Sequence, residues 1–163
     1  MTTVSHPSRL LVIDDNRADL ALFEEAVGAS GLTISLRTCA NATQALEVLQ
    51  TDRQFDLILS DLNMPVVSGV DFVHRLRKDP MLAAIPVALT SSSLRERLPA
   101  RMATVLTDLG VPYFTKASTW TEFMRLVREI DEVLQDGRSG ASARLLAERM
   151  TPATGFRKFC APQ

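Results

Sequence analysis

The sequence predicts an α/β fold, a doubly wound five-stranded parallel sheet with helices on both faces. Five short apolar runs of strand length alternate with five segments of helical periodicity, and each strand precedes its helix. Continuous apolar runs are typical of strands buried on both faces. Strands that alternate with amphipathic helices require right-handed crossovers between parallel strands, which place helices on both sides of the sheet.

The first two strand–helix units have clear beginnings and ends. The run RLLVI at 9–13 predicts a buried strand, and the helix after it has Asn16 as its N-cap and Gly31 as its stop. The alternating segment 32–40 predicts the second strand. Asn41 begins the second helix, with a glutamine three residues later at capping-box spacing.

The third and fourth units follow the same pattern. FDLILS at 55–60 predicts the third strand, and Ser68 caps the helix that follows. IPVALTS at 85–91 predicts the fourth strand. The next segment is mostly helical, but Pro99 requires a break or kink in it, and Gly110 ends it.

The fifth strand is short, PYFTK at 112–116, and a long helix follows it. Thr119 and Glu122 form a capping box at the start of this helix. Its apolar stripe consists of Phe123, Leu126, Val127, Ile130 and Leu134.

Composition excludes several classes of protein. The chain has 163 residues and a net charge of −1, so we expect no binding to nucleic acid. It has no apolar run long enough to span a bilayer and no secretory signal at its start, so we expect a cytoplasmic protein that does not bind membranes. Cys39 and Cys160 are isolated, which argues against a zinc site. We expect a tail over 1–8, one domain over 9–136 and a basic extension over 137–163, where five basic residues meet one acidic residue.

Polar side chains close four of the five predicted strands. Parallel strands end at one edge of the sheet, and open α/β sheets bind ligands there. Three carboxylates at this edge suit a hard cation, above all Mg²⁺. A lysine and a hydroxyl complete a set suited to phosphoryl transfer onto a carboxylate. The residues are Asp14 and Asp15 after strand one, Asp61 at strand three, Thr90 and Ser91 at strand four, and Lys116 at strand five.

Lys116 stands out because the chain has 15 arginines and only 3 lysines. Arginine is therefore the usual cation of this protein, whereas a lysine offers a compact point charge to a phosphoryl group. A lysine that only extends its charge from the strand end into solvent is the plainer alternative for this residue taken alone.

Four motifs at these positions resemble the response-regulator receiver domain, over residues 9–135. They are VIDDN, LILSDLNMPVVSG with Gly69 eight residues after Asp61, the hydroxyl pair that ends strand four, and YFTK. The segments DNRADL, SDLNMP, TSSS and KASTWTEF further resemble single-domain regulators that partner phytochrome-type histidine kinases. The resemblance implies a flavodoxin-like (βα)5 fold with strand order 2-1-3-4-5.

The resemblance also implies a role for each site residue. Asp61 is the phosphoacceptor, and Lys116 and Ser91 contact the phosphoryl group. Ser91 and Tyr113 are switch residues. The family's spacing from Asp61 and from the strand-four proline favours Ser91 as the hydroxyl, with Thr90 as the alternative. The implied Mg²⁺ ligands are Asp15, which binds the ion directly, Asp14, which acts mostly through water, Asp61 and the backbone carbonyl of Asn63.

Two departures from the family's pattern concern the last third of the domain. Ala117 stands where the family has a proline after the lysine, which leaves open whether the Lys116–Ala117 peptide is cis. The segment between Ser91 and Lys116 is about three residues longer than usual and contains Pro99, so the face built by the fourth helix is hard to infer from the family.

The implied function is a phosphorelay switch that receives a phosphoryl group from a sensor histidine kinase and is otherwise not an enzyme, beyond its self-catalysed transfer and autodephosphorylation. We expect a homodimer centred on the final helix, with the tail as a brace. An aspartyl phosphatase would need a second aspartate two residues after Asp61, and a flavin-binding protein would need a phosphate loop after strand one. The 27 residues after 136 are too few for an ordinary DNA-binding domain. A phosphate-independent interaction module is the remaining alternative.

Overall fold

A computed structural model describes residues 6–92 and 100–138 of the chain. Within them, five parallel strands form one sheet in the order β2-β1-β3-β4-β5, which confirms the predicted fold class and strand order. The strands are β1 (Ser8–Ile13), β2 (Ile34–Cys39), β3 (Leu57–Asp61), β4 (Val87–Ser91) and β5 (Tyr113–Thr115). The helices are α1 (Arg17–Ser30), α2 (Ala42–Thr51), α3 (Gly69–Lys78), α4 (Ala100–Asp108) and α5 (Trp120–Arg138).

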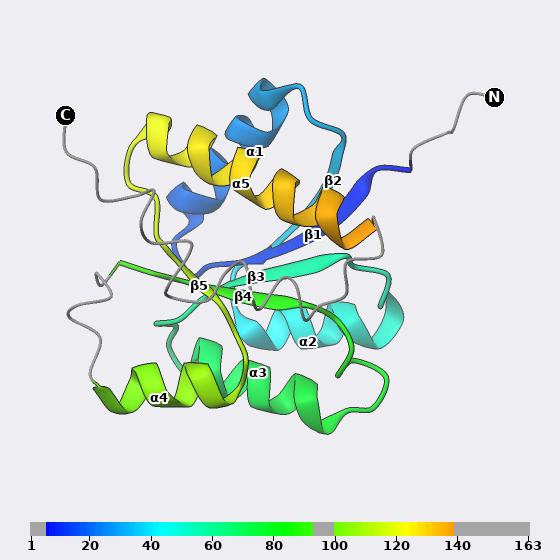
Figure 1. Cartoon of the computed structure of the whole chain (residues 1–163), viewed down its shortest axis with the longest axis vertical. Helices are drawn as coiled ribbons and strands as arrows, with labels where there is room; N and C mark the ends of the chain where they lie inside the picture. The colour runs from blue at the N-terminus through cyan, green and yellow to red at the C-terminus, as the bar shows by residue number, and fades with distance from the viewer. Residues whose placement is uncertain (1–5, 93–99, 139–163) are drawn as a thin grey trace.

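Helices cover both faces of the sheet, α1 and α5 on one side and α2, α3 and α4 on the other (Figure 1). Alternate residues of a strand point to opposite faces, so β1 divides its side chains between two cores. Leu10 and Val12 belong to the cluster under α1 and α5, and Leu11 and Ile13 to the cluster under α2, α3 and α4. The same alternation determines to which face of the sheet the side chain at the end of each strand points.

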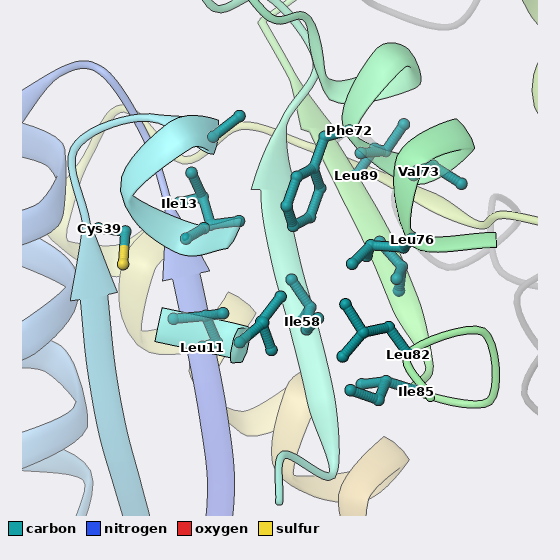
Figure 2. Packing of buried hydrophobic residues seen from close by; sticks show 14 of the residues in the cluster. Leu11, Ile13, Cys39, Ile58, Phe72, Val73, Leu76, Leu82, Ile85 and Leu89 are labelled. Atoms are coloured by element: carbon teal, nitrogen blue, oxygen red, sulfur yellow. The ribbon is translucent and has the colours of Figure 1, made fainter. Parts of the chain in front are cut away.

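The core on the α2, α3 and α4 side is continuous from β1 to β4. Figure 2 shows Phe72 and Leu76 of α3 directed at the side chains of Ile58 in β3 and Leu89 in β4. All four side chains are fully buried. Each contributes roughly 1.5–3 kcal/mol relative to an exposed position, so this core holds α3 and the loop before it firmly against the end of β3.

The helix boundaries confirm most of the predicted caps. The Asn16 side chain accepts hydrogen bonds from the backbone N–H groups of Ala18 and Asp19, at 3.0 Å and 3.4 Å. Asn41 and Ser68 cap α2 and α3 in the same way. Gly31 adopts a left-handed conformation with φ +70° at the end of α1.

At the start of α5, the predicted capping box is complete. The Thr119 hydroxyl accepts from the Glu122 N–H at 3.3 Å, and the Glu122 carboxylate accepts from the Thr119 N–H at 3.1 Å. The same carboxylate accepts from the backbone and hydroxyl of Ser118. These bonds lower the pKa of Glu122, with the Ser118 N–H as the largest cause.

The apolar stripe of α5 lies entirely inside the protein. All five of its residues are buried in the cluster shared with α1, and Phe123 meets Phe23 of α1 edge to face at 6.5 Å between ring centroids. Met124 and Val133 are partly buried and pack against the same cluster. A dimer through α5 would therefore use the flank of this helix, because the stripe covers the sheet; dimerisation stays a prediction.

Several sequence predictions concern the edges of the described residues. The described part of α4 begins directly after Pro99, and residues 93–99, which carry the longer segment, lie outside the description. The basic extension lies outside it from residue 139 onward. Among the residues that the structure describes, no peptide bond is cis, so the Lys116–Ala117 bond is trans.

Across the described ranges, the structure contains no helix with the length and apolar character that a bilayer-spanning segment requires.

Candidate functional site

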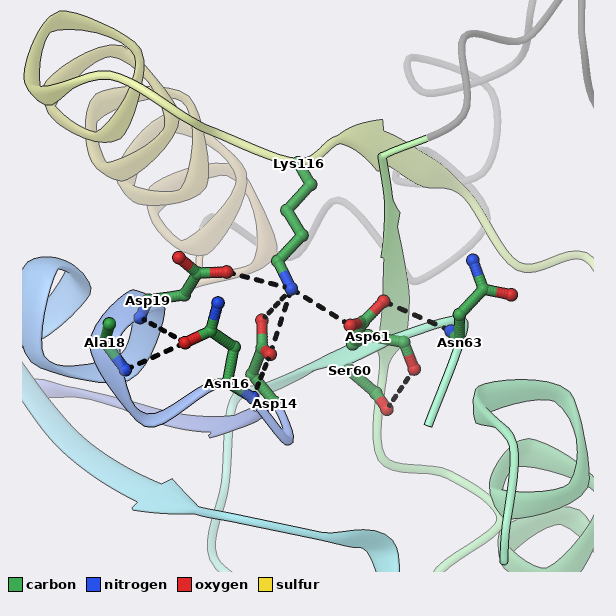
Figure 3. A network of polar contacts seen from close by, with 8 residues as sticks. All are labelled: Asp14, Asn16, Ala18, Asp19, Ser60, Asp61, Asn63 and Lys116. Carbon is green, nitrogen blue, oxygen red and sulfur yellow. Dashed lines mark hydrogen bonds and ion pairs between the residues drawn. The ribbon is translucent and has the colours of Figure 1, made fainter. Parts of the chain in front are cut away.

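The carboxyl edge of the sheet brings two of the predicted carboxylates, Asp14 and Asp61, to one ammonium group (Figure 3). Lys116, directly after β5, places its Nζ 2.7 Å from Asp14 Oδ2 and 3.0 Å from Asp61 Oδ2. Asp14 follows β1, and Asp61 is the last residue of β3. The two carboxylates are nearly inaccessible to solvent, at 6% and 5% exposure. Parallel pairing of three strands thus turns residues far apart in the sequence into one charged site.

Strand alternation explains why these side chains share a face. The residues two positions before Asp14 and Asp61 are Val12 and Leu59, and both belong to the cluster under α1 and α5. Because side chains two positions apart point to the same side of a strand, both carboxylates lie on that face. In β4, Thr90 is the register partner of Asp61, so its side chain lies on the same face.

Three carboxylates at this edge fit a divalent cation. Asp14, Asp15 and Asp61 each offer an oxygen, and these atoms lie within 4.8 Å of one another. Like charges at that distance repel by about 3 kcal/mol at an effective dielectric of 20, so a second positive charge stabilises the group. The oxygens are ligands that Mg²⁺ prefers, and exposed Asp15 leaves room for the waters that this ion keeps.

Asn63 lies beside the phosphoacceptor candidate. Its backbone N–H donates to Asp61 Oδ1 at 3.1 Å, which fixes the orientation of that carboxylate. The metal role assigned to the Asn63 carbonyl stays a prediction.

Burial and the neighbouring charges act in opposite directions on the pKa values of Asp14 and Lys116. Burial raises the pKa of Asp14, while the Lys116 ammonium and the Asn16 N–H act to lower it. Burial alone would lower the pKa of Lys116, but its hydrogen bonds to Asp14, Asp19 and Asp61 raise it above the ordinary value. Lys116 therefore carries its positive charge throughout the neutral pH range.

The structure separates the two candidate hydroxyls. Thr90 lines a small cavity together with Asp14 and Lys116. Ser91 is fully buried, is the register partner of Thr115 and points to the opposite face of the sheet from Thr90. The family spacing favours Ser91, whereas this geometry favours Thr90, and the role of either hydroxyl stays a prediction.

We expect Thr90→Ala to slow phosphorylation of Asp61 by acetyl phosphate roughly ten- to hundredfold, because a hydrogen bond to a charged group contributes about 1.5–3 kcal/mol. Ser91→Ala should slow it much less, since Ser91 points away from Asp61. Initial rates of phosphoryl incorporation at saturating Mg²⁺ measure both effects. The reverse order of the two variants would assign the hydroxyl to Ser91.

Tyr113 lies on the other side of the sheet from Lys116. It is partly buried and packs against the core under α2, α3 and α4. Its implied role as a switch residue stays a prediction.

The loop between β3 and α3 approaches Asp61 closely. The Gly69 N–H donates to the Leu62 carbonyl at 2.9 Å. A Cβ on Gly69 would lie 2.5 Å from the Asp61 carbonyl oxygen and 2.9 Å from Leu62 Cα, both backbone atoms. Only glycine therefore allows α3 to begin this near the end of β3.

We expect Gly69→Ala to lower the free energy of unfolding by about 1–3 kcal/mol, because the methyl group must displace the end of β3. It should also slow phosphorylation of Asp61. Gly28→Ala is the matched control: no atom lies within 4 Å of its added Cβ, and alanine in a helix gains about 0.5–1 kcal/mol over glycine. Urea unfolding measures both variants, and a Gly69→Ala protein as stable as wild type would contradict the close approach.

The same loop contains a strained turn at Val66. Its φ is +68°, and the Val67 N–H donates to the Pro65 carbonyl at 2.8 Å, which closes a γ-turn. The Val66 side chain is 99% exposed. A β-branched residue in this conformation costs roughly 1–3 kcal/mol, and the exposed side chain recovers nothing by packing.

Asp19 belongs to the site although sequence reasoning did not include it. Its Oδ2 lies 3.0 Å from Lys116 Nζ, as close as Asp61 Oδ2 (Figure 3). The signal in the sequence was its spacing from Phe23, four residues later and buried against α5. Residues four apart share a helix face, so Asp19 lies on the inward face of α1.

Comparison with known proteins gives one consistent result. A family model described as the response regulator receiver domain matches residues 10–128. The two-component response regulator ORR3 of Oryza sativa subsp. indica is 29% identical over 129 residues, covering 78% of this chain and 95% of ORR3. The polar-differentiation response regulator DivK of Brucella anthropi is 34% identical over 90 residues, covering 55% of this chain and 71% of DivK.

Among solved structures, the phosphorylated cyanobacterial phytochrome response regulator RcpA is 28% identical, with a TM-score of 0.66, covering 79% of this chain and 94% of RcpA.

Proposed function

Because this chain belongs to the response regulator receiver domain family, we propose that it accepts a phosphoryl group on Asp61 and signals by a conformational change. The observation that carries the proposal is the contact of Lys116 Nζ with both Asp61 and Asp14. A buried carboxylate, a fixed ammonium and a neighbouring group of carboxylate oxygens are the parts that phosphoryl transfer to an aspartate requires.

The reaction forms one bond and breaks one. A carboxylate oxygen of Asp61 attacks the phosphorus of a phosphohistidine, the P–N bond breaks, and the imidazole leaves with the electron pair. Lys116 binds an oxygen of the transferred group, and the hydroxyl at the end of β4 donates to another. Later attack by water on phosphorus returns the Asp61 carboxylate and inorganic phosphate.

Mg²⁺ is the proposed cofactor, and the carboxylates of Asp14, Asp15 and Asp61 would hold it together with the Asn63 carbonyl. When bound, the cation offsets the negative charge that gathers on the phosphoryl oxygens and the carboxylates. Asp14 and Asp61 contribute fixed, buried oxygens, whereas exposed Asp15 supplies its oxygen from the solvent side.

The proposed phosphodonor is a sensor histidine kinase, and the likeness to RcpA supports one with a phytochrome-type sensor. We further propose that the chain acts as a single-domain regulator in the cytoplasm. The phosphorylated state would change the face that contains α4, β5 and α5, with Tyr113 and the β4 hydroxyl as the switch residues.

The test is to map the modified residue. Wild-type protein is treated with acetyl phosphate and Mg²⁺, the acyl phosphate is reduced with borohydride, and the peptides are sequenced by mass spectrometry. We expect the reduced residue at position 61. Transfer from labelled kinases then identifies the donor. Modification at another residue would contradict the assignment, and no modification by any donor would favour a phosphate-independent interaction module.

We also propose a homodimer through the flank of α5, with the extension after 138 as a brace. A two-fold contact is the commonest form of oligomer, and Met124 and Val133 remain partly exposed beside the buried stripe. Light scattering at micromolar concentration should give about twice the chain mass of 17.9 kDa. A monomeric mass with and without beryllofluoride would contradict the dimer.

A further inference from the structure

We propose that Asp19 is a positioning residue that keeps the Lys116 ammonium at the phosphoryl site when Asp14 and Asp61 engage a cation. The inference rests on the proposed phosphorylation of Asp61. It assigns to α1 a part in the chemistry that is separate from covering the sheet.

The first step is the valence of the ammonium group. A lysine has three N–H donors and no acceptor. Lys116 Nζ lies within 3.0 Å of a carboxylate oxygen from each of three residues, Asp14, Asp19 and Asp61. Its side chain is only 17% exposed, so these three carboxylates replace most of its hydration.

The second step is that the three partners are not equivalent. Asp14 and Asp61 belong to the group of oxygens that could hold a cation, and Asp19 does not. When those two carboxylates share their charge with a cation, their attraction for Lys116 falls. Asp19 keeps its full charge for Lys116 and becomes the partner that holds the ammonium group.

The third step is that the fold fixes Asp19. Its backbone N–H donates to the Asn16 side chain at the start of α1. One turn later Phe23 is buried at 3% exposure and packs against Phe123 of α5. The rotation of α1 about its axis is therefore set by the core, which keeps Asp19 on the side of the helix that faces Lys116.

Other carboxylates of α1 show that this arrangement is particular to Asp19. Glu24 accepts from the Thr38 hydroxyl of β2 at 2.7 Å, and Glu25 is exposed to solvent. The Asp19 side chain is 22% exposed and faces the ammonium group. Lys116 has a long flexible stem, so a fixed partner on α1 restricts where its charge can lie.

The experiment compares Asp19→Asn with Glu25→Gln, which removes one charge from the same helix outside the site. At saturating Mg²⁺ and acetyl phosphate, we expect Asp19→Asn to slow phosphorylation roughly fivefold, which corresponds to about 1 kcal/mol. Glu25→Gln should leave the rate at the wild-type value. In a Lys116→Met background, Asp19→Asn should have no further effect, because its action passes through the lysine.

A second readout uses metal-free protein and needs no phosphorylation. In wild type, Asp19→Asn removes an ion pair with Lys116 but also removes repulsion from Asp14 and Asp61. In Lys116→Met protein only the repulsion is removed. The urea midpoint should therefore rise more when Asp19→Asn is made in the Lys116→Met background than in wild type.

Equal midpoint shifts in both backgrounds, or a wild-type phosphorylation rate for Asp19→Asn, would overturn the inference. The failure of the proposed function looks different: wild-type protein would then incorporate no phosphate at position 61. An Asp19→Asn effect that persists undiminished in Lys116→Met protein would assign Asp19 a role independent of the lysine.

Discussion

Asp61→Asn protein should incorporate no phosphate from acetyl phosphate or from a histidine kinase, and it should not respond to beryllofluoride. The amide has nearly the same shape as the carboxylate but carries no charge, so it cannot form the acyl phosphate. Lys116 retains Asp14 and Asp19 as partners, so the site keeps much of its geometry. Labelled phosphate and intact-protein mass measure the loss.

The control for this variant is its folding. Asp61→Asn removes an ion pair with Lys116, which keeps Asp14 and Asp19 as partners, and it relieves the repulsion between buried Asp61 and Asp14. We therefore expect the urea midpoint of Asp61→Asn to equal or exceed that of wild type. Labelling of the variant at the wild-type level would show that another residue accepts the phosphoryl group.

The second large effect concerns the cation. Mutation of a residue that only hydrogen-bonds to a metal ligand typically weakens metal binding roughly ten- to hundredfold. Asp15 is the proposed direct ligand, so Asp15→Asn should weaken Mg²⁺ binding by at least this factor. Asp14→Asn should weaken it less, since Asp14 is proposed to act mainly through water. Asp14 also forms an ion pair with Lys116 and accepts from the Asn16 N–H.

Calorimetric titration of metal-free protein with Mg²⁺ measures both affinities. The single tryptophan, Trp120, is half-exposed at the start of α5, four residues after Lys116, and its fluorescence provides a second measurement. Wild-type affinity in both variants would show that the carboxylate group has another purpose. A larger loss in Asp14→Asn would exchange the two proposed roles.

Much of the fold could be predicted from the sequence because its signals are local. The Thr119–Glu122 capping box, the Asn16 cap and the glycine at position 31 are each contained within a few residues, and the structure reproduces them. The gathering of Asp14, Asp61 and Lys116 also followed, since parallel strands must end at one edge of the sheet.

What could not be predicted depended on register and on helix rotation. Counting from Asp61 selects Ser91, and the pairing of β3 with β4 places Thr90 opposite Asp61, so the choice between the two hydroxyls stays a prediction. One residue of difference moves a side chain to the other face. Asp19 was missed because its spacing from Phe23 places both residues on one face of α1, but the sequence does not show that this face meets Lys116.

Position 66, in the γ-turn, can be substituted without changing the packing of the core. Most stabilising changes must improve packing without disturbing neighbours, but this side chain has almost none to disturb. Glycine at position 66 would adopt the same backbone conformation without the steric penalty of a β-branched side chain. It would also raise the conformational entropy of the unfolded chain, which acts against this gain in stability. Position 66 therefore separates backbone energy from core packing, two quantities that most substitutions near a functional site change together.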